Sequence, residues 1–306
     1  MAPIQQRCVH IGFPKTGTTT LQSLVFNRHL EIFNLGKPYA NGELQLLVRT
    51  LAVGDPKTYD WDGVGRSFQA HVKAALPASG ARLIMMSDER LTGNPRVPRA
   101  VQAVRLFQLF GDSKILIVIR EHRDMLRSMY YQSMRGANVK RHFSTFSDWL
   151  GEAFEKAESG PLARLEYLHT VEAYANCFER DRIKVLLFET LLQDQQKFAD
   201  ELSGFLGVDA EETRRLIAGR GLNPRMSTAD LRLKHIVARF PGAETLRRIA
   251  PPPLRKAARS ALGGSQPVEV VFPADLSNRI ENHFRAQNRT LAARYDLPLA
   301  ARGYAV

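Results

Sequence analysis

The residues "CVHIGFPKTGTTTLQ" (8–22) are the part of the sequence that is most informative about the fold. An apolar run leads into a turn and then into a helical pattern, which is the strand–loop–helix order of a phosphate-binding loop. Gly12 and Gly17 have the G-x-x-x-x-G spacing of that loop. The lysine expected after the second glycine is missing, because Thr18 stands there and Lys15 lies two positions before Gly17. The stretch therefore predicts an anion-binding loop whose cation is in an unusual place.

Five short apolar runs predict buried strands, and each is followed by a helical or loop segment. These runs are residues 8–13, 32–35, 83–87, 115–119 and 183–188. The alternation predicts an α/β fold: a doubly wound, mainly parallel five-stranded sheet with a P-loop-like phosphate-binding loop and helical excursions. Ligands of such sheets bind at the carboxyl ends of the strands.

We expect the whole chain, residues 1–306, to form a single domain. A short helix over 198–206 should end at Gly207, since glycine is a frequent C-terminal cap. The stretch 250–267 is expected to be irregular because it is rich in Pro and Gly. Three larger features are predicted: a helical lid at about 136–180, a mobile basic Pro/Gly-rich segment at about 232–267, and a C-terminal helix at about 273–295.

The net charge of +12 favours an anionic ligand or an anionic surface. No basic motif interleaved with aromatic residues is present, so we expect no nucleic-acid partner. A peripheral contact with a membrane surface remains open. No apolar run approaches the ~20 residues that span a bilayer, and the N-terminus lacks the pattern of a signal peptide, so we expect a cytoplasmic protein. Two cysteines form neither a disulfide framework nor a zinc site.

The loop has two possible interpretations. Backbone N–H groups from Thr16 to Thr20 should face an anion at the start of a helix. A small-molecule kinase of the P-loop class would use ATP and magnesium, with Thr19 and Asp88 as the magnesium ligands. The kinase hypothesis requires a lysine after the second glycine, and this sequence has none there.

The segment "PKTGTTTLQ", residues 14–22, resembles the 5′-phosphosulfate loop of sulfotransferases that use 3′-phosphoadenosine 5′-phosphosulfate (PAPS). A second motif, "ILIVIREHRDMLRS" (115–128), resembles the part of that family that binds the 3′-phosphate. It places Arg120 at a strand end and Ser128 eight residues later in the next helix, which Asp124 is expected to cap. An arginine fork with a hydroxyl suits a phosphate dianion.

The resemblance also implies where the base lies. The histidine that cytosolic members carry after the third strand is absent from "SDERLTGNP" (87–95), which has carboxylates instead. This is similar to the carbohydrate-modifying branch, so Glu89 is the first candidate for the base and Asp88 the second. The alternative for Glu89 is an ion pair with Arg90 or Arg120.

The remaining roles follow from the resemblance, which spans residues 8–208 and includes the similar segment 185–208. Lys15 would neutralise charge on the bridging oxygen, so no metal is expected. Thr16, Gly17, Thr18, Thr19 and Thr20 would hold the 5′-phosphate, and Asn223 and Arg225 would close over the nucleotide. The family implies a bacterial enzyme with a hydroxyl acceptor on a glycan or glycolipid. The sequence does not indicate an oligomeric state.

Overall fold

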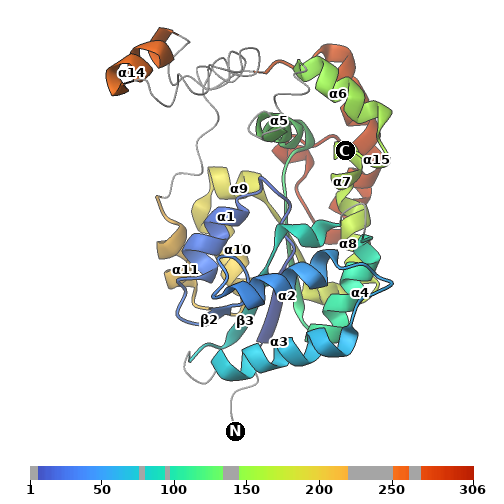
Figure 1. The fold of residues 1–306 in the computed structure, drawn as a ribbon. Coiled ribbons are helices and arrows are strands. Elements are labelled where there is room, and N and C mark those ends of the chain that lie inside the picture. The colour runs from blue at the N-terminus through green and yellow to red at the C-terminus, as the bar shows by residue number, and fades with distance from the viewer. Residues whose placement is uncertain (1–5, 76–79, 94–96, 134–144, 220–250, 262–269) are drawn as a thin grey trace. The chain divides into compact units, whose positions relative to one another are not determined.

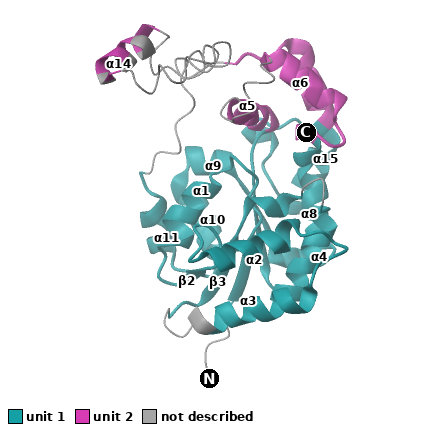
Figure 2. Ribbon diagram, in the orientation of Figure 1, with its two compact units in different colours: residues 1–121, 163–220, 284–306 teal, residues 122–162, 221–283 magenta. Residues whose placement is uncertain are grey.

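The computed structural model describes residues 6–75, 80–93, 97–133, 145–219, 251–261 and 270–306. The chain divides into two compact units (Figure 2). Unit 1 contains Met1–Glu121, Ala163–Arg220 and Phe284–Val306, and unit 2 contains His122–Leu162 and Gly221–His283. The sequence-based expectation of one domain over 1–306 stays a prediction.

Unit 1 is built on a five-stranded sheet in which every pairing is parallel, with the strand order β2-β3-β1-β4-β5. The strands are β1 (Gln6–His10), β2 (Ile32–Asn34), β3 (Leu83–Ser87), β4 (Lys114–Ile119) and β5 (Ile183–Leu187). All five residues of β3 are buried, as is expected of a strand covered on both faces. The predicted α/β class and the parallel sheet are confirmed.

Helices cover both faces of this sheet (Figure 1). One group contains α2 (Gly42–Val53), α3 (Trp61–Ala75), α4 (Arg99–Phe110) and α8 (Tyr167–Ala175). The other contains α1 (Thr18–Thr20) with the π-helix η1 (Leu21–Phe26), α9 (Phe188–Gln193), α10 (Gln195–Leu206) and α11 (Ala210–Ile217). Among its described residues, unit 1 also has three short 3-10 helices: η3 (Glu89–Thr92), η5 (Arg180–Arg182) and η6 (Ala300–Arg302).

The remaining helices belong wholly or partly to unit 2. They are α5 (His122–Ser133), α6 (Phe146–Glu155), α7 (Pro161–Arg164), α14 (Pro252–Ala261) and α15 (Ala274–Tyr295). α15 occupies the range of the C-terminal helix expected at about 273–295. The irregular structure expected for 250–267 is wrong for residues 252–261, which form α14. Pro252 is its first residue, a position where the missing N–H of proline removes no helical hydrogen bond.

Two helix ends test the sequence interpretation further. α10 ends at Leu206, and Gly207 caps it in the left-handed conformation (φ 73°), as predicted. The start of α5 differs from expectation, because the helix already begins at His122. Asp124 therefore lies inside the first turn instead of capping it, and its carboxylate accepts a hydrogen bond from Arg127 Nη1 at 2.7 Å. An acidic residue in this turn still favours the helix dipole.

Candidate functional site

The carboxyl ends of the parallel strands gather charged residues at one edge of the sheet. Because the strand order is known, the order of these residues across the edge is known too. Lys37 follows β2, and the pair Asp88 and Glu89 follows β3. Next along the edge, Lys15 follows β1 and Arg120 follows β4. Glu189 follows the last strand, β5. Along the edge from β2 to β5 the chain thus carries one cation, a pair of carboxylates, two cations and one carboxylate.

The loop after β1 has the backbone of an anion-binding turn. Lys15 (φ 70°) and Gly17 (φ 77°) both adopt positive φ, with the buried Thr16 between them. A lysine in this conformation is strained, which is typical of functional loops. Successive N–H groups in such turns point into a common concave space that suits an anion. The structure therefore gives the predicted loop the geometry that phosphate binding requires.

The threonine hydroxyls of this loop have different roles. Thr16 Oγ1 donates to the carbonyl of Phe13 at 2.6 Å, and Thr18 Oγ1 donates to the same carbonyl at 3.1 Å. These two hydroxyls brace the turn from inside, so contacts of Thr16 and Thr18 with an anion would come from their N–H groups. Thr19 is exposed and Thr20 is half-buried, so the side chains of these two threonines are accessible from outside the loop.

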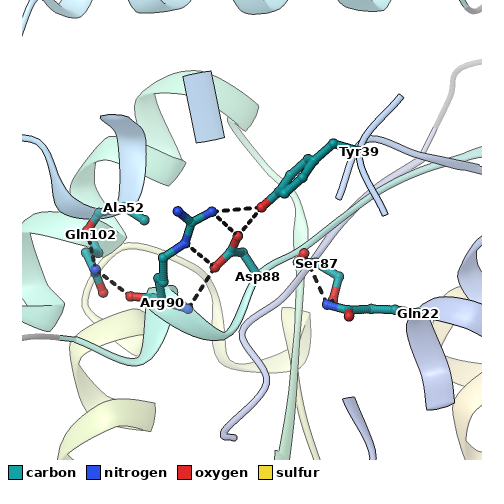
Figure 3. Close-up of polar contacts among 7 residues, drawn as sticks. All are labelled: Gln22, Tyr39, Ala52, Ser87, Asp88, Arg90 and Gln102. Carbon is teal, nitrogen blue, oxygen red and sulfur yellow. Dashed lines mark hydrogen bonds and ion pairs between the residues drawn. The ribbon is translucent and has the colours of Figure 1, made fainter. Parts of the chain in front are cut away.

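Beneath the loop lies a buried polar network that keeps its shape. Burial lowers the pKa of His10 to about 3, so its ring is neutral. Ser87 Oγ lies 2.7 Å from His10 Nδ1. It also accepts a hydrogen bond from Gln22 Nε2 at 3.0 Å (Figure 3). A Cβ on Gly12 would lie 2.7 Å from His10 Cε1, so only glycine fits there.

Asp88 is fully buried, and its carboxylate is saturated with donors. The backbone N–H and Nε of Arg90 donate to Oδ1 at 2.8 and 2.9 Å, and Arg90 Nη2 donates to Oδ2 at 2.6 Å. The hydroxyl of Tyr39 also donates to Oδ2 (Figure 3). Burial alone would raise the pKa of Asp88, but the hydrogen bonds from Arg90 and Tyr39 outweigh burial and lower it. Four donors fill the four acceptor positions of the carboxylate.

Glu89 differs from Asp88 in every respect that matters for proton transfer. Its side chain is half-buried and makes no hydrogen bond or ion pair within the described part of the chain. Burial raises the pKa of Glu89, and the charge of Asp88 adds to the rise, whereas the positive charges of Lys37 and Lys15 oppose it. The expected alternative, an ion pair with Arg90 or Arg120, is not formed there, since Arg90 pairs with Asp88.

Lys37 was missed by the sequence interpretation. It follows β2, and its backbone N–H lies 3.4 Å from the carbonyl of Ser87 at the end of β3. Gly36 makes this approach fit, because a Cβ there would lie 2.4 Å from the backbone nitrogen of Ser87. The signal in the sequence is a Gly-Lys pair directly after a weak strand, which is too common to identify a site.

Arg120 lies at the end of β4 and reaches the loop after β1. Its Nη1 donates to the carbonyl of Lys15 at 3.2 Å, and its guanidinium carbon is 4.8 Å from the ring centroid of Phe188. The strand end of the second sequence motif thereby contacts the first motif. Ser128 is half-buried in the second turn of α5, within unit 2. Asn223 and Arg225 lie outside the described residues.

No three His, Cys, Asp or Glu side chains among the residues that the structure describes are grouped as metal ligands would be. No described helix combines the length and apolar character that a membrane crossing needs.

Comparisons with known proteins agree with this fold. The family described as "Sulfotransferase domain" matches residues 5–223. The crystal structure of a sulfotransferase from Alicyclobacillus acidocaldarius is similar over 97% of this chain and 98% of that chain, with a TM-score of 0.60 and 18% identity. Mouse sulfotransferase SULT7A1 complexed with PAP is similar over 94% of this chain and 86% of that chain, with a TM-score of 0.47 and 13% identity. No curated protein matches the sequence.

The phosphate-loop geometry and the parallel sheet define a nucleotide-binding α/β protein. The family match extends over more than half of the chain, and the chain therefore belongs to the sulfotransferase domain family. It is a sulfotransferase, as the resemblance of the two motifs implied, and the expected PAPS-dependent family is confirmed.

Proposed function

We propose that this enzyme moves the sulfuryl group of PAPS to an acceptor hydroxyl by in-line displacement, with Glu89 as the base. The observation that carries the proposal is the order of the strand ends, which puts a half-buried carboxylate beside the anion-binding loop and Lys15. In the reaction the acceptor oxygen attacks sulfur while the bond from sulfur to the bridging oxygen breaks. The acceptor proton passes to Glu89, and 3′-phosphoadenosine 5′-phosphate (PAP) leaves with the electron pair.

Lys15 and the loop act on the leaving group. The N–H groups of residues 16–20 hold the 5′-phosphate, and Lys15 neutralises the charge that develops on the bridging oxygen. The left-handed backbone conformation of Lys15 places this lysine within the turn, before the second glycine. A P-loop kinase has its lysine after the second glycine instead. No metal is part of this scheme.

Arg120 holds the 3′-phosphate, together with Ser128 as the family pattern implies. The carbonyl of Lys15 and the ring of Phe188 already restrict the guanidinium, which lowers the entropy lost on binding. We retain Asn223 and Arg225 as residues that close over the nucleotide.

We assign the base to Glu89 and give Asp88 a supporting role. A general base must have a lone pair that can reach the substrate. All four acceptor positions of Asp88 are occupied, and its lowered pKa makes it a weak base. The same saturation disfavours the kinase alternative, which needs Asp88 as a magnesium ligand. Asp88 instead holds the turn η3 that presents Glu89.

The acceptor is proposed to be a hydroxyl on a glycan or glycolipid, because the base is a carboxylate as in the carbohydrate-modifying branch. Contact with a membrane surface, a bacterial origin and a cytoplasmic location stay predictions made from the sequence.

A thermal-shift series separates the two enzyme classes. Stabilisation by PAP in the presence of a chelator supports the sulfotransferase mechanism, because a ligand that binds only the folded state raises its melting temperature. Stabilisation by ATP that requires magnesium, with none by PAP, would support the kinase instead.

A further inference from the structure

The peptide unit between Arg120 and Glu121 is held at both of its polar ends by side chains. The hydroxyl of Tyr167 donates to the carbonyl of Arg120 at 2.7 Å, and Glu189 Oε1 accepts from the N–H of Glu121 at 2.9 Å. This carbonyl and this N–H belong to one planar amide. Two hydrogen bonds on opposite edges therefore fix the orientation of that plane, and with it the direction in which Arg120 leaves the strand.

Glu189 is a buried carboxylate that the transfer mechanism does not use. Its side chain is 7% exposed, and its second oxygen accepts from the hydroxyl of Tyr304 at 3.1 Å. Burial raises the pKa of Tyr304 well above its ordinary value, so the phenol stays protonated and remains a donor. A buried acceptor is stable only when donors satisfy it. The segment after α15 thus supplies a donor that helps to keep Glu189 in place.

The turn that carries Glu189 also contacts the loop after β1. The ring of Phe188 lies under the Arg120 guanidinium. A Cβ on Gly17 would lie 2.9 Å from Leu191 Cδ2 and 3.2 Å from Phe188 Cε2. Residues 188–191 therefore pack against the phosphate loop and against Arg120 at the same time.

From these contacts we propose that Glu189 is a positioning residue for the donor nucleotide, acting through the Arg120–Glu121 peptide, with Tyr304 as its support. The inference rests on the proposed role of Arg120 at the 3′-phosphate. Without Glu189 the N–H of Glu121 loses this buried acceptor, the peptide plane is held from one side only, and the guanidinium loses its fixed direction. Misplacement of a binding group by a small distance is costly.

The test compares two nucleotides that differ only in the 3′-phosphate. Calorimetry of PAP and AMP binding is performed on the full chain and on Glu189→Ala, Glu189→Gln and Tyr304→Phe. Glu189→Ala should weaken PAP binding about tenfold and leave AMP binding unchanged, because AMP has no 3′-phosphate for Arg120 to bind. Tyr304→Phe should weaken PAP binding by about threefold, and Glu189→Gln should retain most of the affinity because its amide oxygen still accepts from Glu121.

The control is Glu172→Ala, which removes a partly exposed carboxylate that pairs with Arg294 away from the strand ends. It should leave both affinities unchanged. Equal losses for PAP and AMP, or no loss in any variant, would overturn the positioning role alone. If Glu189→Ala does not fold, the ratio of PAP to AMP affinity in Tyr304→Phe decides the matter, and an unchanged ratio overturns the inference. Failure of the wild-type chain to bind PAP would overturn the proposed function and this inference with it.

Discussion

Arg120 donates a hydrogen bond from Nη1 to the backbone carbonyl of Lys15 at 3.2 Å. The two residues are far apart in the sequence and follow neighbouring strands, β4 and β1. This contact joins the 5′-phosphosulfate motif to the strand end of the 3′-phosphate motif. A nucleotide with phosphates at both positions would therefore lie across the ends of β1 and β4, with its sulfonate toward β3 and Glu89.

The first prediction concerns the two cations of the donor site. Lys15→Ala and Arg120→Ala should each reduce transfer from labelled PAPS by about a hundredfold or more, because each removes a charge-assisted contact with the nucleotide. Lys73→Ala and Arg182→Ala are matched controls: Lys73 is exposed on α3, and Arg182 forms a surface ion pair with Asp112. Near-normal turnover of either donor-site variant would contradict the role assigned to that residue in binding the nucleotide.

The second prediction concerns pH. Glu89 must be ionised to accept a proton, and burial raises its pKa. The kcat/KM should therefore fall as pH decreases through a midpoint above the ordinary value of 4.5. Lys37→Met removes a positive charge that opposes the rise, so the midpoint should move to higher pH, and Lys37→Arg should restore it. An identical acidic limb in wild type and Lys37→Met would show that Lys37 does not act on the base.

Glu89→Gln provides the companion test of the base. The amide is nearly isosteric but cannot accept the proton, so kcat should fall by about a hundredfold or more while PAP binding is retained. A variant that keeps both kcat and the acidic limb would rule out Glu89 as the base.

The third prediction separates the two carboxylates by stability. Asp88→Asn breaks a buried pair and should lower the free energy of unfolding by about 3 kcal/mol, the low end for such pairs because Arg90 is partly exposed. The lowered pKa of Asp88 means that its contribution is present above the ordinary value of 3.8 and is lost as pH falls through the native value. Chemical denaturation at neutral and acidic pH measures both effects.

Asp112→Asn is the control for that series, since Asp112 forms an exposed ion pair with Arg182. It should cost less than about 1 kcal/mol. Equal unfolding free energies for Asp88→Asn and wild type would contradict the supporting role given to Asp88.

The fourth prediction concerns Gly12. A Cβ at this position would lie 2.6 Å from Thr18 Oγ1 and 2.7 Å from His10 Cε1, both buried. Gly12→Ala should therefore distort the turn and weaken PAP binding. Gly204→Ala is the control, because nothing lies near its Cβ position inside α10, and it should be neutral or slightly stabilising. Wild-type PAP affinity in Gly12→Ala would show that the loop tolerates the displacement.

Much of unit 1 could be predicted from the sequence because its signals are local. The apolar runs predict the strands, with β3 matching residues 83–87 and β4 beginning one residue early at Lys114. The strand–loop–helix pattern predicts the phosphate loop, and the Arg120 motif follows a clear strand. α14 was missed because the proline run suggested irregular structure, although proline is well tolerated at a helix start.

The remaining features of the site depend on strand order and tertiary contacts. Asp88 and Glu89 are adjacent carboxylates in the sequence, and only the structure shows that Arg90 and Tyr39 saturate one and not the other. Lys37 approaches Glu89 because β2 pairs with β3. Tyr304 donates a hydrogen bond to Glu189, which lies 115 positions earlier in the sequence. A local sequence pattern cannot predict such contacts, because they join residues that are distant in the sequence.

The decisive experiment is titration calorimetry of the wild-type chain with PAP in the presence of a chelator. Two motifs that converge at the ends of β1 and β4 predict saturable binding of one PAP per chain, with weaker binding of AMP. No detectable heat at millimolar PAP, or equal affinities for PAP and AMP, would contradict the account.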